Sequence, residues 1–166
     1  TNYDDLLEKA FEKAKEPYHK LVYMADEAGE GEGLTHPGNF LHWTPDGELN
    51  VIESANEYGN LEEYMRTETE ERYPVIIKIH GAVDRADSSN PNDTSALNPS
   101  YVITEDHYID FLTRADISNL LPGSLAAALK RNHFLFLGYS LRDWNLRVIL
   151  RRIWREQKLN YNSWAV

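Results

Sequence analysis

The most reactive combination in this chain is His80 followed by Gly81, directly after the apolar run 74–79. Such a run predicts a strand buried in a parallel sheet, so the imidazole should lie at the strand's carboxyl end. Histidine titrates near neutral pH and can act as a general base, and Gly81 permits an unusual turn and the close approach of a ligand. The alternative is a structural histidine that only bonds the backbone.

Two further polar clusters are expected at the same edge of the sheet. Asn2 and Asp4 precede the first predicted helix, where they can either cap that helix or contact a sugar or an amide. Residues 138–143 (GYSLRD) form a turn from a predicted strand into a helix, whose amino terminus attracts phosphate or ribose oxygens. Asp143 is interpreted as the N-cap of that helix. Each cluster alone is a weak indication of a binding site.

Other candidate motifs are rejected on their chemistry. The glycines between positions 29 and 33 lack the dinucleotide-binding spacing, and Glu30 and Glu32 would repel phosphate. The arginines of the last predicted helix are interpreted as a solvated face rather than a nucleic-acid site. The remaining histidines have no metal-ligand spacing and are expected to be surface or structural residues: His19, His36, His42, His107 and His133.

Strands that alternate with helices predict a single α/β domain over residues 1–166, with a parallel sheet and helices on both of its faces. The predicted strands are 19–24, 48–53, 74–79 and 133–137. The predicted helices are 4–16, about 123–131 and about 144–157, and another starts at Thr104. The first helix should have an apolar face made of Leu7, Ala10, Phe11 and Ala14. The last helix should expose Arg147, Arg151 and Arg155 to solvent. Residues 25–73 are interpreted as an acidic insertion on the surface of the core, and residues 84–100 as an exposed loop.

Composition and charge narrow the class of protein. Hydrophobic residues make up 42% of the chain, enough for a core, yet no run of 18 apolar residues exists, so no membrane span is expected. The lack of cysteine excludes disulfides, a thiolate nucleophile and a Cys-based zinc site, and it fits the reducing cytoplasm. The net charge of −10 disfavours nucleic acid as a partner, although the local charge is −11 over 26–73 and +6 over 130–158.

Taken together, the clusters resemble the sirtuin-like domains of bacterial defence proteins. The resemblance covers roughly residues 1–12 and 74–150, and four motifs carry it in this order: T-N-Y-D-D-L-L-E, I-K-I-H-G, T-E-D-H-Y-I-D-F-L and F-L-F-L-G-Y-S-L-R-D-W-N. It implies a truncated Rossmann-like domain that handles NAD as substrate or ligand, without zinc. The resemblance implies that Asn2 and Asp4 lie near the nicotinamide and ribose, that His80 is the base, and that Asn2 is a second catalytic residue. It also implies that Gly81 contacts the cofactor and that the adenosine half is contacted by Gly138, Ser140 and Leu141.

The resemblance also implies an activity. Defence relatives hydrolyse NAD to ADP-ribose and nicotinamide, whereas true sirtuins pass ADP-ribose to an acetyl-lysine; the absence of cysteine and the presence of Tyr3 favour the defence type. In this family a Gly-rich loop that binds the phosphates precedes the Asn-containing strand, and we expect the chain as given to begin after that loop. We therefore expect the chain to be an inactive fragment of a cytoplasmic bacterial NAD hydrolase with a role in antiphage defence.

Alternatives to hydrolysis remain open from the sequence. One is a non-catalytic module that senses NAD or ADP-ribose. Another is a protein-interaction domain that presents the acidic segment 26–73 to a basic partner. For the full-length protein, a homo-oligomer or a partner effector domain is a further expectation. For the chain as given, a missing first strand would expose a sheet edge, so we expect either self-association through that edge or a rearranged start that separates Asn2 from His80.

Overall fold

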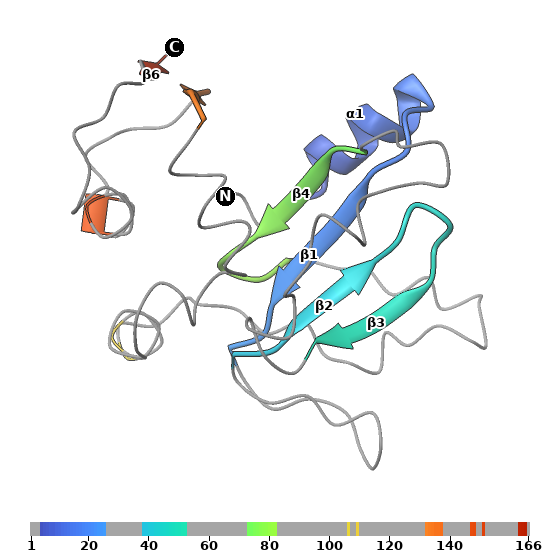
Figure 1. The fold of residues 1–166 in the computed structure, drawn as a ribbon, viewed down its shortest axis with the longest axis horizontal. Helices are drawn as coiled ribbons and strands as arrows, with labels where there is room; N and C mark the ends of the chain where they lie inside the picture. The colour runs from blue at the N-terminus through green and yellow to red at the C-terminus, as the bar shows by residue number, and fades with distance from the viewer. Residues whose placement is uncertain are drawn as a thin grey trace.

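The computed structural model describes the amino-terminal half of the chain in three blocks and the remainder in short pieces. The described residues are 4–25, 38–52, 73–82, 106, 109, 132–137, 147–148, 151 and 163–165. They form one helix with a four-stranded sheet, and a separate pair of short strands (Figure 1).

Helix α1 (Leu6–Ala14) confirms the first predicted helix. At its start, the Leu6 N–H donates to Asp4 Oδ1 at 3.1 Å, and the Lys9 N–H donates to the Asp5 carbonyl at 2.9 Å. At its end, Lys15 adopts a left-handed conformation with φ 59°, and its N–H bonds the Glu12 carbonyl. Pro17, which cannot continue a helix, follows two residues later.

The buried face of α1 is not the predicted apolar one. Leu7 is 52% exposed, and Ala10 and Ala14 are also exposed, whereas Glu8 is buried. A helix buries a charged side chain only where that charge has a partner, and Glu8 has one in the sheet below. The periodicity therefore predicts the helix but not which face it turns to the core.

Four strands form the main sheet in the order β3-β2-β1-β4. They are β1 (His19–Tyr23), β2 (Phe40–Trp43), β3 (Leu49–Ile52) and β4 (Val75–Lys78). Strand β4 runs parallel to β1, with His19 beside Val75, while β2 runs antiparallel to both β1 and β3. The sheet is thus mixed, and the prediction of a parallel sheet is wrong for β2 and β3.

A hairpin turn explains the antiparallel part of the sheet. The Thr44 N–H bonds the Glu48 carbonyl, the Thr44 hydroxyl accepts from the Glu48 N–H, and Gly47 has φ 84°. This tight turn returns the chain directly alongside β2, which only an antiparallel pair permits. The strand predicted at 48–53 is confirmed as β3, whereas β2 was not predicted.

Strand β2 belongs to the core of the domain. Phe40 and Leu41 of β2 are 1% and 3% exposed, and Leu41 packs in one cluster with Val22, Met24 and Ala82. The acidic insertion expected over 25–73 is therefore not confirmed, because β2 within this range is buried. Asp46 and Glu48 lie in the turn between β2 and β3, whereas the strands carry mostly apolar side chains.

The predicted strand at 133–137 is confirmed as β5 (Phe134–Phe136), which pairs in parallel with β6 (Ser163–Ala165). It was expected to be buried, but Leu135 is 60% exposed and Leu137 is 68% exposed. A two-stranded sheet leaves much of its side-chain surface uncovered. The loop expected at 84–100 and the helix expected at about 123–131 lie outside the described residues.

Parts of the later predicted helices are described. Asp106 and Ile109 are helical, as are Arg147, Val148 and Arg151, and the two arginines are exposed as predicted. Helices on both faces of the main sheet are not confirmed. Within the described parts of the chain, no helix has the length and apolar character needed to cross a bilayer.

Candidate functional site

The carboxyl end of β4 carries the histidine predicted to do chemistry. His80 follows the strand by two residues and is 6% exposed, and the next residue but one, Ala82, is packed in the core cluster. Because β4 and β1 are parallel, their carboxyl ends meet at one edge of the sheet. His80 therefore lies where the sequence predicted it, at the carboxyl end of a strand in a parallel pair.

Gly81 makes the turn that the sequence predicts. Its φ is 88°, in the left-handed region that residues with a Cβ avoid, and it forms an isolated parallel bridge with Ile79. The chain thus bends sharply after β4 while His80 stays buried.

Lys78, the last residue of β4, joins this strand end to the start of α1. Its Nζ lies 3.0 Å from Glu8 Oε1 and donates a hydrogen bond to the backbone carbonyl of Asp4. Lys78 is 4% exposed and Glu8 is 6% exposed, so the ion pair is shielded from water. Two segments separated by 74 residues in the sequence therefore meet at the strand end.

Asp4 is the second predicted site residue with a described side chain. Its carboxylate accepts the Leu6 N–H, which is the capping role weighed against a ligand contact in the sequence. Its carbonyl accepts a hydrogen bond from Lys78, which precedes His80 by two positions, so Asp4 lies beside the end of β4. The structure thus brings Asp4, His80 and Gly81 to one edge. The other predicted site residues lie outside the described residues: Asn2, Gly138, Ser140 and Leu141.

The Lys78–Glu8 ion pair was not predicted from the sequence, although one feature of the sequence indicated a buried cation. Lys78 interrupts the apolar run 74–79, and it lies on the same face of β4 as the buried Ile76. A cation at such a position requires an anionic partner, because burying an unpaired charge is very costly. The partner could not be identified from the pattern, since Glu8 lies on the side of the helix expected to face solvent.

A pair of buried histidines was also missed. Nδ1 of His19 on β1 and Nε2 of His42 on β2 are 3.0 Å apart, and the two residues are 5% and 3% exposed. Burial lowers the pKa of His42 to about 4, helped by the neighbouring His19. Burial also lowers the pKa of His19, although Asp46 opposes this shift. Both rings are therefore neutral at pH 7, which agrees with the structural role expected for them.

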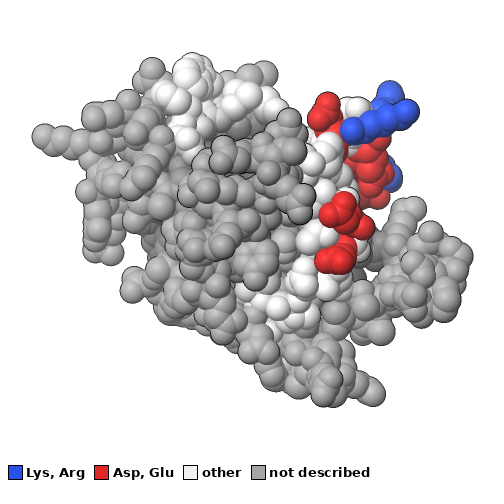
Figure 2. Space-filling view, turned by 45° about the vertical axis from the view of Figure 1, so that its right-hand side comes forward, with Lys and Arg blue, Asp and Glu red and all other residues white. Residues whose placement is uncertain are grey.

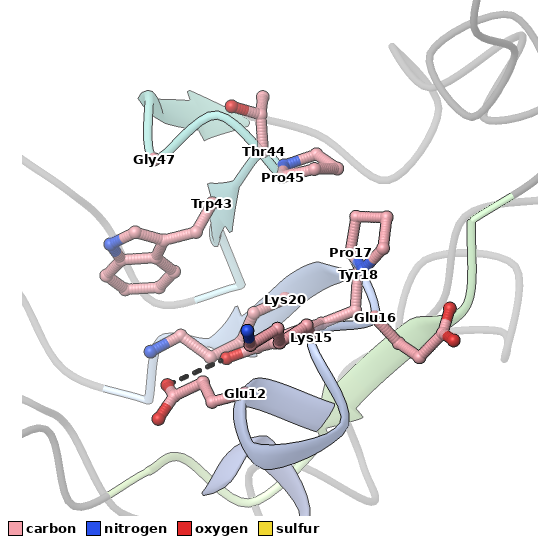
Figure 3. A pocket seen from close by; sticks show the side chains of 10 residues that line it. All are labelled: Glu12, Lys15, Glu16, Pro17, Tyr18, Lys20, Trp43, Thr44, Pro45 and Gly47. Carbon is pink, nitrogen blue, oxygen red and sulfur yellow. Dashed lines mark hydrogen bonds between the residues drawn. The ribbon is translucent and has the colours of Figure 1, made fainter. Parts of the chain in front are cut away.

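A pocket of about 460 Å³ lies at the other end of β1 (Figure 3). It opens between the end of α1 and the β2–β3 turn, and its lining residues are Glu12, Lys15, Glu16, Pro17, Tyr18, Lys20, Trp43, Thr44, Pro45 and Gly47. Lys20 Nζ sits 4.1 Å from the centre of the Trp43 ring. The pocket is at the amino end of the parallel pair, whereas ligands of such sheets bind at the carboxyl end. It is therefore separate from the His80 edge.

Acidic and basic side chains lie side by side on the described surface (Figure 2). On α1, Lys9 Nζ is 2.9 Å from Asp5 Oδ2, and these side chains are 60% and 44% exposed. Exposed pairs of this kind contribute little to stability. Among the described residues, no three His, Asp or Glu side chains gather closely enough to hold a metal ion.

The mixed sheet with its parallel β1–β4 pair, α1 beside the strand end and the His-Gly turn are consistent with a Rossmann-like α/β fold. The family model of the SIR2-like domain matches residues 1–166, and the chain therefore belongs to this sirtuin-like family. No curated protein and no solved structure matched the chain. SIR2-like domains generally bind NAD, which gives the chain an NAD-related function.

Proposed function

We propose that the protein cleaves the bond between nicotinamide and ribose in NAD, with water as the acceptor, and that His80 is the base. The observation that carries this proposal is the position of His80, buried at the carboxyl end of β4 beside the start of α1. Family membership supplies the NAD-related chemistry. The main sheet supplies a histidine where such a substrate is expected to bind.

The residues at this edge fit the proposed substrate. Gly81, with φ 88° and no side chain, presents no Cβ to a ligand that approaches the strand end. The shielding of His80 from bulk water strengthens its electrostatic interactions with a bound group. Asn2 is proposed to orient the nicotinamide or the attacking water. Gly138, Ser140 and Leu141 are proposed to contact the adenosine half.

The proposed reaction balances with NAD and water alone. The glycosidic bond breaks, nicotinamide leaves with the bonding electron pair, and water adds to the ribose carbon. His80 accepts the proton from that water or from a ribose hydroxyl, and the products are ADP-ribose and nicotinamide. The proposal extends to a cytoplasmic bacterial protein that depletes NAD in defence against phage, as the resemblance implies.

Substitution of His80 tests the proposal in the natural protein that carries this chain. His80→Ala should abolish nicotinamide release from NAD, since removal of a general base costs about 100-fold or more in rate. His133→Ala is the matched control, because His133 is an exposed histidine next to β5 and should leave the rate unchanged. Wild-type turnover in His80→Ala would remove His80 from the mechanism.

A further inference from the structure

We propose that Lys78 is a positioning residue for the site at His80: its ammonium group holds the start of α1 against the end of β4, and Glu8 holds the ammonium group in place. This inference rests on the proposed cleavage of NAD. It assigns a function to a buried cation that the sequence places inside an otherwise apolar strand.

The contacts of Lys78 reach both parts of the candidate site. Its Nζ bonds the carbonyl of Asp4 and lies 3.0 Å from Glu8 Oε1. Asp4 follows Asn2 by two residues, and His80 follows Lys78 by two residues. Because two residues of chain span at most about 7 Å, the Lys78 contact limits how far Asp4 and His80 can separate.

A contribution to stability does not by itself account for this ion pair. Replacing a buried ion pair by apolar side chains of similar volume is often neutral or stabilising. The Lys78 ammonium does more than neutralise Glu8, because it also bonds a main-chain carbonyl that lies just before the helix. That second bond fixes the path of the backbone that carries Asp4, which a Leu or Met at position 78 could not do.

Glu8 acts as the support of Lys78. Its Oε1 faces the ammonium group, while its buried Oε2 accepts no hydrogen bond from the residues that the structure describes. Removing Lys78 alone would leave an uncompensated buried carboxylate and strongly destabilise the domain. A single substitution of Lys78 therefore cannot separate positioning from folding, and paired substitutions are needed.

Two kinds of variant separate the bond to Asp4 from the ion pair. Glu8→Gln removes the negative charge but leaves the Lys78 ammonium able to bond the Asp4 carbonyl. The double substitution Glu8→Met with Lys78→Met removes both interactions and keeps the buried volume similar. The double substitution Glu8→Gln with Lys78→Gln is a second neutral pair, whose shorter side chain at position 78 falls short of Asp4.

The measurements are steady-state nicotinamide release from NAD and amide hydrogen exchange in the first turn of α1, residues 6–9. Both double variants should lower kcat by about 100-fold with little change in KM, the scale expected for a small misplacement of reacting groups. Their first-turn amides should exchange faster. Glu8→Gln should destabilise the domain, because the buried ammonium group loses its counter-ion. In the folded variant the bond to the Asp4 carbonyl remains, so kcat should fall, and first-turn exchange should rise, much less than in the double variants.

The outcomes distinguish this inference from the proposed function. Wild-type kcat in a folded double variant, or an equal loss in Glu8→Gln, overturns the positioning role of Lys78 even when His80→Ala is inactive. If the wild type releases no nicotinamide, the proposed cleavage fails, and the exchange rates still decide whether Lys78 holds the start of α1. Unchanged exchange in both double variants would show that it does not.

Discussion

The two buried histidines, His19 and His42, share one hydrogen bond in which one ring must donate and the other accept. At 3.0 Å between Nδ1 and Nε2, the rings can play these roles only while at least one of the two nitrogens is free of a proton. Protonating both would place two positive charges in contact inside the sheet. The lowered pKa of each ring, caused first by burial, shows that the fold favours the neutral forms.

Stability should therefore depend on pH through His42. Its pKa is about 4 in the folded protein and 6.5 in an unfolded chain, so the unfolded state binds the proton more tightly between these values. The contribution is fully present above pH 6.5 and is lost as the pH falls toward 4, by about 3.5 kcal/mol at most at 1.4 kcal/mol per pKa unit.

Urea unfolding at pH 7, 5.5 and 4.5 measures this dependence. The carboxylates of the protein also titrate in the lower part of the range, so the comparison with His42→Gln isolates the histidine. The variant should lose less free energy of unfolding between pH 7 and 4.5 than the wild type does. An equal loss in both proteins would show that His42 is not the titrating group.

Gly81 gives a second prediction at the level of a single residue. Because its φ is 88°, Gly81→Ala should destabilise the protein by about 1–2 kcal/mol, the cost of a left-handed conformation for a residue with a Cβ. Gly81→Asn should cost less, since asparagine tolerates this region better. Thermal unfolding of the two variants checks the order, and equal melting temperatures for wild type and Gly81→Ala would contradict it.

Among the elements, the hairpin β2–β3 is where the sequence and the structure differ most. Strand β3 was predicted at 48–53, but β2 was not, because its four residues are too few for a strand pattern to be decisive. By contrast, the longer patterns of 4–16, 19–24 and 74–79 predicted α1, β1 and β4. Tertiary packing, which the local pattern does not contain, decides the rest.

The place of β2 in the core can be tested by truncating one side chain. Phe40 is 1% exposed, so Phe40→Ala should lower the free energy of unfolding by about 3–5 kcal/mol. Val51→Ala is the control, because Val51 lies on the outer strand β3 and is 39% exposed. Urea unfolding should show a small effect for Val51→Ala. Similar, small effects for both variants would contradict a core position for β2.

For the whole molecule, the candidate site depends on contacts between distant parts of the chain. His80 and Gly81 could be predicted from one local pattern, a buried strand followed by a turn. Asp4 was predicted at the same edge from its place before the first helix, but the bond that holds it there comes from Lys78, 74 residues away, and was not predicted. No local pattern relates Lys78 to Glu8 or His19 to His42, because each pair forms only when the sheet is assembled.

The central claim is that this SIR2-like domain serves a protein that hydrolyses NAD with His80 as base. The most direct measurement is mass spectrometry of the products formed from NAD by the natural protein in water enriched in ¹⁸O. The predicted result is nicotinamide with an equal amount of ADP-ribose that carries one ¹⁸O, and neither product from the His80→Ala variant. NAD that binds in calorimetry yet stays intact would contradict the claim, as would labelled product from His80→Ala.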